Sequence, residues 1–238
     1  FLAEVNASSN VIIMCRTYYV NILKQELFHT NSYKLDARNE NDIILSHFDK
    51  CQKLQVLIPD KHKKLPTMYW IPKLHKKPYK SRFIAASSSC TTKQISVLLT
   101  SFLSKIKEHV KLYCEKAYEN SGINLYWSIK NSMDILSKLK LNHFQVSSLS
   151  TYDFSTLYTT LPHDLIKEKL LELIQKTFDR EKCSYMACNS NRAFFTDNPV
   201  KDYVMWTCSN VCKALTFLLD NIFVRYGDTV YRQVIGIP

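Results

Sequence analysis

The spacing of apolar and polar positions predicts helices joined to short strands. Helical periodicity marks residues 19–27 and 43–54, and an apolar run at residues 11–14 is expected to be a strand. The polar stretch at residues 31–41 is expected to be a loop. The first quarter of the chain is therefore predicted to be mostly helical.

A basic hairpin is predicted in the next segment. Residues 68–71 have the composition of a strand that stops at Pro72, and residues 82–85 suggest the returning strand. The residues between them include Pro78 and many lysines, which favours an exposed turn. The two strands should form a hairpin whose tip lies in solvent.

Longer helices are predicted further along the chain. Thr91 or Thr92 can cap a helix that runs toward Tyr118, and Ser128 can cap another. Both helices are expected to turn their apolar residues inward. In the first these are Ile95, Leu98, Leu99, Phe102, Ile106 and Val110, and in the second Ile129, Met133, Ile135, Leu136 and Leu139.

The C-terminal part is predicted to combine strands with two more helices. Residues 146–153 are a strand candidate, and Pro162 begins a helix with acidic residues early and basic residues late, as the helix dipole favours. Ser209 is expected to cap a helix over residues 211–223. A turn at residues 226–229 should join two further short strands.

Composition narrows the function classes. The 238 residues are 46% hydrophobic, enough to bury the core of one large domain or two small ones. The chain has 3 glycines, which excludes Gly-rich phosphate loops of the Walker or dinucleotide type. Because no run of 18 uncharged apolar residues occurs, we expect no membrane span.

The positive charge is concentrated in one segment. The formal net charge is +11, and residues 61–107 hold ten Lys and one Arg but no Asp or Glu. Basic and acidic residues balance in the rest of the chain. Aromatic and apolar residues interleave with these lysines, which favours a folded surface facing a polyanion over a solvated charge run without a partner.

The eight cysteines are interpreted as mostly reduced, intracellular thiols, because the chain is too long and too rich in ordinary core for a disulfide scaffold. One cluster is worth testing as a zinc site, namely Cys183, Cys188, Cys208 and Cys212. Its spacings fit a zinc knuckle poorly. The last two cysteines also have the one-turn helical spacing of buried thiols that act as small hydrophobes.

A segment near residue 153 offers the clearest candidate chemistry. Asp153 is expected to end a strand, where its carboxylate and the backbone carbonyl of Phe154 can hold a divalent cation against phosphates. Tyr158 can return to the same pocket, lie under a nucleotide sugar and exclude a 2′-hydroxyl. From spacing alone, an N-capping Asp153 with a core tyrosine is the preferred interpretation.

The order of the motifs favours the catalytic interpretation. Asp153, Tyr158 and Pro162 have the spacing of the first catalytic motif of reverse transcriptases. The Ile-Pro-Lys-Leu-His-Lys-Lys-Pro sequence at residues 71–78, followed by Arg-Phe-Ile-Ala at residues 82–85, resembles the fingers motif of these enzymes, with Phe in place of their usual Pro after the Arg. Its extended form is especially similar to Penelope-like retroelements.

The resemblance implies roles for individual residues. Lys73 and Arg82 would grip the triphosphate of an incoming deoxynucleotide. Asp153 and the Phe154 carbonyl would bind the catalytic Mg²⁺ or Mn²⁺. The other nucleotide-binding residues would be Tyr158 as the sugar gate, Gln233 and Gly236. The residues contacting an RNA template and a DNA primer would be Lys76, Lys77 and Lys80.

The resemblance also implies a fold and its limits. We expect an α+β architecture, the fingers and incomplete palm of a right-hand polymerase, with short antiparallel strands and several amphipathic helices. Residues 1–60 would be a helical extension, residues 61–149 a basic fingers-like region and residues 150–238 the start of the palm. The Tyr-x-Asp-Asp motif, which supplies the other metal-binding carboxylates, does not occur. We therefore expect a fragment that is inactive alone and lacks the rest of the palm, the thumb and the nuclease.

Two further interpretations stay open. The chain could be a non-catalytic relic that binds nucleic acid through its basic hairpin, or a purely structural protein. A polymerase and a binding relic both predict salt-dependent binding of nucleic acid, but only the polymerase needs Asp153 and Tyr158. A nuclear location is implied by the retroelement resemblance alone.

Overall fold

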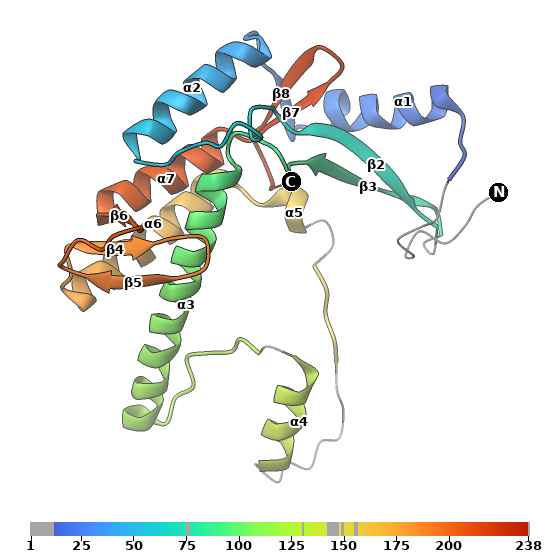
Figure 1. The fold of residues 1–238 in the computed structure, drawn as a ribbon. Helices are drawn as coiled ribbons and strands as arrows, with labels where there is room; N and C mark the ends of the chain where they lie inside the picture. The colour runs from blue at the N-terminus through green and yellow to red at the C-terminus, as the bar shows by residue number, and fades with distance from the viewer. Residues whose placement is uncertain are drawn as a thin grey trace. The chain divides into compact units, whose positions relative to one another are not determined.

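The computed structural model describes residues 12–74, 77–129, 131–141, 148, 150–154 and 157–237, apart from the side chains of residues 138, 140, 141, 158 and 159 (Figure 1). The chain divides into two compact units. The first comprises Phe1–Leu103 with Thr156–Pro238, and the second comprises Ser104–Ser155. Helices and mostly antiparallel strands both contribute, so the mixed α+β class expected from the sequence is confirmed.

A five-stranded sheet of order β1-β8-β7-β2-β3 organises the first unit. Its strands are β1 (Tyr33–Leu35), β2 (Thr67–Lys73), β3 (Lys80–Ala86), β7 (Phe223–Tyr226) and β8 (Thr229–Gln233). Neighbouring strands are antiparallel except β2 and β7, whose parallel contact joins Thr67 to Arg225. The sheet therefore joins strands from all three segments into which the resemblance divides the sequence.

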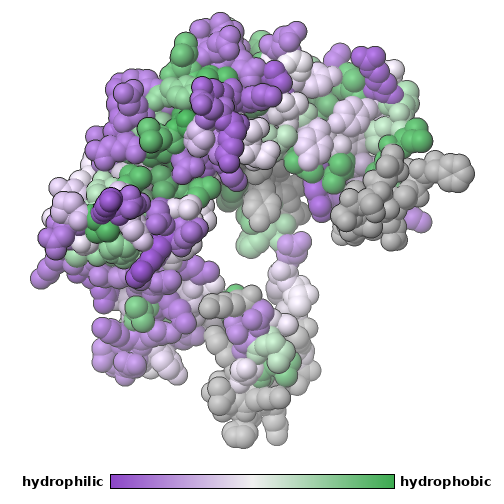
Figure 2. Space-filling model, viewed as in Figure 1, coloured by the Kyte–Doolittle hydropathy of each residue, from purple (hydrophilic) through white to green (hydrophobic). Residues whose placement is uncertain are grey.

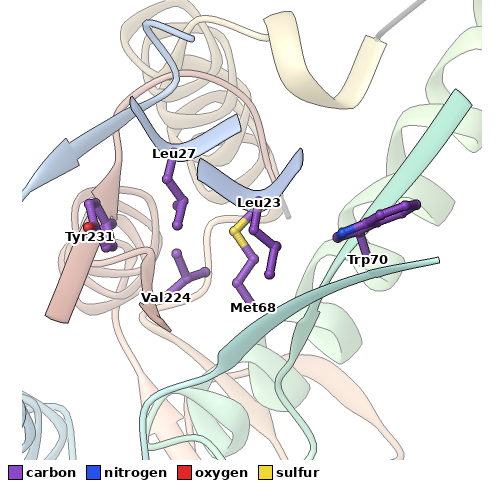
Figure 3. Close-up of a cluster of buried hydrophobic side chains, with 6 residues drawn as sticks. All are labelled: Leu23, Leu27, Met68, Trp70, Val224 and Tyr231. Atoms are coloured by element: carbon purple, nitrogen blue, oxygen red, sulfur yellow. The ribbon is translucent and has the colours of Figure 1, made fainter. Parts of the chain in front are cut away.

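Helix α1 (Arg16–Lys24) and the π-helix η1 (Gln25–His29) cover one face of this sheet. Their Leu23 and Leu27 pack against four buried side chains of the strands, namely Met68, Trp70, Val224 and Tyr231 (Figure 3). Full burial of one leucine stabilises the fold by about 1.5–3 kcal/mol. The predicted helix at residues 19–27 is confirmed and extends further at both ends.

Helix α2 (Glu40–Lys53) packs on the opposite face of the sheet. Its Ile43 meets Phe223 and Val230, which alternate along the strands with the residues that face α1. The side chain of Asn39 accepts a hydrogen bond from the Asp42 amide at 2.9 Å and caps the helix. The predicted helix at residues 43–54 is confirmed, with an earlier start.

Two helices and a small sheet complete the first unit. Helices α6 (His163–Glu181) and α7 (Cys208–Asp220) pack against each other. The antiparallel sheet β5-β4-β6 consists of β4 (Tyr185–Cys188), β5 (Ala193–Thr196) and β6 (Val204–Trp206). Trp206 is fully buried, and its Nε1 donates to the Leu54 carbonyl at 2.8 Å. This hydrogen bond ties the small sheet to the end of α2.

Helix α3 (Lys93–Ser121) begins in the first unit and continues into the second, which also contains α4 (Ser132–Leu141). The apolar face predicted for α3 is confirmed from Ile95 to Ile106. In α4, however, Met133, Ile135 and Leu136 are exposed, so the inward face predicted after Ser128 is wrong. Helical spacing identified an apolar stripe in both helices, but only α3 has a partner for it in the described residues.

Three predictions about strands are wrong. Residues 12–14 form no strand, and residue 11 lies outside the described residues. Strand β1 interrupts the loop that we expected at residues 31–41. Residues 150–154 form neither helix nor strand, where the sequence predicted the end of one. Whether such a short run forms a strand depends on the residues that pair with it and pack against it in the folded chain. The local sequence pattern does not contain that information.

Two predicted element ends also differ from the structure. Strand β2 continues through Pro72. Only β3 pairs with β2 at that position, and the Pro72 nitrogen, which carries no hydrogen, lies on the unpaired edge of β2. Helix α7 is capped by Thr207, whose Oγ1 accepts from the Asn210 amide at 3.3 Å, and not by Ser209. It ends at Asp220, before β7. No described helix is long and apolar enough to cross a membrane.

Candidate nucleotide and nucleic-acid interface

The β2–β3 hairpin sorts its side chains onto two faces. Residues directly opposite each other in an antiparallel pair point to the same side, whereas successive residues of one strand point to opposite sides. Lys73 lies opposite Lys80, and Ile71 lies opposite Arg82. Lys73, Lys80 and Arg82 therefore share one face of the hairpin, together with Tyr69.

The other face of the hairpin is apolar and anchors it. Met68, Trp70 and Pro72 are buried there. The Trp70 ring stacks on Tyr19 of α1 with 5.3 Å between ring centroids, and Trp70 Nε1 donates to the Tyr19 carbonyl at 3.0 Å. Helix α1 thus holds the strand from the side opposite the three cations.

The cationic face has no acidic partner among the described residues. Lys73, Lys77, Lys80 and Arg82 form no ion pair there, and Lys76 lies outside the described residues. Lys73 and Lys80 are direct cross-strand neighbours, an arrangement in which like charges destabilise a sheet. A bound phosphate would relieve this repulsion, and the planar guanidinium of Arg82 can pair with it bidentately.

A second junction in the first unit holds Gln233 and Gly236. Pro162 and Ile235 form an antiparallel bridge, and the Gly236 amide donates to the Leu161 carbonyl at 2.8 Å. Gly236 has a φ of +81°, a conformation that glycine adopts without strain. The segment after β8 is therefore fastened to the residues that precede α6.

His163 fixes the same junction from the first residue of α6. Its ring is buried, and Nε2 donates to the Gly236 carbonyl at 2.5 Å. Gln233 is also buried, and its Nε2 donates to the Ile235 carbonyl at 3.0 Å. Sequence reasoning missed this contact of His163, because the two residues are 73 positions apart and no local pattern joins them.

Tyr158 lies just before this junction. It belongs to the short helix α5 (Leu157–Thr160), whose last residue is followed by Leu161 and Pro162. The backbone of Tyr158 is therefore close in sequence to the residues that pair with the Gly236 segment. Only its backbone is described, so its role as a sugar gate stays a prediction.

Asp153 and Phe154 belong to the second unit, whereas all the residues above belong to the first. Both are exposed, Phe154 by 76%. Among the residues that the structure describes, no group of three or more His, Cys, Asp or Glu side chains is placed to hold a metal ion. The carboxylate of Asp153 and the carbonyl of Phe154 are oxygen ligands of the kind that Mg²⁺ prefers, and their metal role stays a prediction.

A cavity of about 270 Å³ beside Gln233 contains a network of charges. Lys167 pairs with Asp164 at 2.9 Å and with Asp220 at 3.0 Å. These two hydrogen bonds raise the pKa of Lys167. Asp220, for which the sequence suggested no catalytic role, is thus part of an ion pair that ties α7 to α6.

The cysteines proposed as a zinc cluster are free thiols. Burial raises the pKa of Cys188 to about 12. Burial, followed by the nearby Cys212 thiol, raises the pKa of Cys208 to about 11. Cys208 Sγ donates to Gln175 Oε1 at 3.2 Å. Among the described residues, these four cysteines do not form a group placed to hold a metal ion, so the geometry lends the zinc interpretation no support.

Comparison with known proteins adds no family to this geometry. No protein-family model matches the chain, and no curated protein matches it. The described residues bring Lys73, Lys80 and Arg82 together on one surface and fasten Gly236 beside His163. The function proposed below therefore rests on the residues of the site and on the order of the sequence motifs.

Proposed function

We propose that this chain is the fingers hairpin and opening palm segment of a reverse transcriptase similar to those of Penelope-like retroelements. The observation that supports it most is the register of β2 and β3, which places Lys73, Lys80 and Arg82 on one face, opposite the apolar anchor. Three cations on one face of a paired hairpin suit a triphosphate or a nucleic-acid backbone. The motif order along the sequence, with Asp153 after the hairpin, favours the polymerase assignment.

The proposed reaction is RNA-directed DNA synthesis. The primer 3′-hydroxyl would attack the α-phosphate of a deoxynucleoside triphosphate, and pyrophosphate would leave. Lys73 and Arg82 would hold the triphosphate, while Asp153 and the Phe154 carbonyl would supply ligands for one Mg²⁺, the ion that stabilises charge on the phosphates. Because two metals need more than one carboxylate, the chain alone is expected not to extend a primer.

The proposal is tested by binding of a deoxynucleoside triphosphate with Mg²⁺ to the whole chain, in the presence of an RNA template annealed to a DNA primer. Arg82→Ala should weaken nucleotide binding about tenfold or more, because it removes charge-assisted hydrogen bonds. Arg192→Ala is the matched control, since Arg192 is exposed and lies over the Phe194 ring at 5.3 Å, away from the hairpin. Equal affinities for the two variants would contradict the proposal.

A second candidate is a nucleic-acid-binding relic without catalysis. The observation that favours it is the exposure of Asp153 in a unit separate from the cationic hairpin. Such a relic should bind RNA or DNA equally well with Asp153→Asn and show no response to added deoxynucleotides. Loss of Mg²⁺-dependent nucleotide binding in Asp153→Asn would instead favour the polymerase. A nuclear location belongs to the proposal and rests on the resemblance alone.

A further inference from the structure

An open groove of about 610 Å³ lies between α2 and α7, away from the hairpin. Lys50 and Lys53 line it from the C-terminal end of α2, and Lys213 lines it from α7. Leu54 and Phe217 form its floor and are almost fully buried. Hydrophilic residues, with some hydrophobic ones among them, lie over α2 in the space-filling view (Figure 2). The groove thus has an apolar floor and cations on both walls.

Two of these lysines have no counter-ion. Lys53 pairs with Asp49 at 2.7 Å, but within the described part of the chain neither Lys50 nor Lys213 forms an ion pair. Lysines on other helices do pair with a nearby acid, as Lys176 does with Glu172. Lys50 and Lys213 are also exposed on different helices, so both positive charges face the solvent in the groove.

The start of α7 adds to the positive character of the groove. Its first turn contains no acidic residue, unlike the first turns of α2 and α6. No acidic side chain in that first turn therefore offsets the positive end of the helix dipole. Ser209 and Asn210 also line the groove, and their uncharged side chains can donate hydrogen bonds. The one acidic residue of its lining, Asp220, is engaged by Lys167 at 3.0 Å.

We propose that this groove binds the phosphate backbone of a nucleic-acid strand, as a second contact separate from the β2–β3 hairpin; this inference rests on the proposed function. Cations on both walls of an open groove suit a strand that passes through it. The Phe217 ring is only 7% exposed, so the floor offers no accessible ring on which a base could stack. Contact should therefore be made with the backbone and be independent of base sequence.

The test is the salt dependence of binding of a single-stranded RNA oligonucleotide to the whole chain. Replacing Lys50 and Lys213 together by Gln should weaken binding and reduce the slope of log K against log salt by about 1.4, the loss of two phosphate contacts. The matched control replaces Lys182 and Lys201 by Gln, which changes the net charge equally at exposed positions outside the groove. Thermal unfolding of both variants should match the original chain, because all four lysines are exposed.

The outcomes separate the groove from the hairpin. If Lys73→Gln with Arg82→Gln weakens binding but the groove variant does not, the groove inference is overturned while the proposed function stands. If neither variant changes binding, both are overturned. If the groove variant loses affinity for a free nucleoside triphosphate but keeps its affinity for RNA, the groove is a small-molecule site and the strand proposal is wrong. If the groove variant loses affinity equally for two oligonucleotides of different sequence, the result supports contact with the backbone.

Discussion

Trp206 in the first unit is fully buried, whereas Trp127 in the second unit is 81% exposed. The same contrast holds for aliphatic residues, since Leu23 is 1% exposed and Met133 is 65% exposed. Apart from Ile106 and Cys114, the buried hydrophobic residues of the described part of the chain belong to the first unit, where other elements, often from a distant part of the sequence, cover them. Amphipathic spacing therefore shows which side of an element is apolar, but not whether the folded chain covers that side.

The largest expected difference between the two units is in the stability lost when a tryptophan of each is replaced by alanine. Trp206→Ala should lower the free energy of unfolding by about 3–5 kcal/mol, because it leaves a cavity and removes the hydrogen bond to the Leu54 carbonyl. Trp127→Ala should change it by less than about 0.5 kcal/mol, because the ring is exposed. Urea unfolding of both variants measures the comparison. Equal destabilisation would mean that the second unit buries Trp127.

A pH effect should follow from His47 in the core of the first unit. Burial, aided by the positive charge of Arg38, lowers the pKa of His47 to about 4. The unfolded chain then binds a proton that the folded chain does not, so stability should fall as the pH drops from about 6.5 to about 4. The loss from this group should reach about 3 kcal/mol.

Unfolding free energies measured across this pH range test the role of His47. His47→Gln keeps a polar side chain that can bond Thr91, which His47 meets through Nδ1 at 2.7 Å, but it cannot titrate. This variant should be less stable at neutral pH and should show a flatter pH dependence. An unchanged slope would assign the effect to other groups.

A smaller effect should distinguish the true cap of α7 from the predicted one. Thr207→Ala should cost about 1 kcal/mol, because the Thr207 hydroxyl accepts the Asn210 amide hydrogen bond. Ser209→Ala should be nearly neutral, since Ser209 is exposed and lies inside the helix. Thermal unfolding of the two variants compares them directly. A larger loss for Ser209→Ala would restore the prediction made from the sequence.

Local patterns predicted the long elements well. The helices at α2, α3 and α6, the β2–β3 hairpin and the turn between β7 and β8 follow from periodicity, charged ends and turn residues. Strands β4, β5 and β6 were not predicted, because each has only three or four residues and is too short to show a period of alternation. Their stability depends on pairing with one another and on burial of Trp206, which links them to α2.

The candidate site, too, could be predicted from the sequence only in part. The concentration of lysines in residues 61–107 and the hairpin could be predicted, and the register then explains why three cations share a face. The contact of His163 with the Gly236 carbonyl could not, because it depends on how two distant segments pair. Nor could the groove that Lys50 and Lys213 line, because the two lysines are 163 positions apart in the sequence and no local pattern joins them.

The most direct test of the central claim compares two charge changes on opposite faces of β3. Arg82→Gln and Ser81→Asp each lower the net charge by one, but the register places Arg82 on the cationic face and Ser81 on the other. Arg82→Gln should weaken binding of single-stranded RNA and reduce the slope of log K against log salt by about 0.7. Ser81→Asp should leave that slope unchanged. Equal reductions in the two variants would contradict a phosphate-binding face on the hairpin.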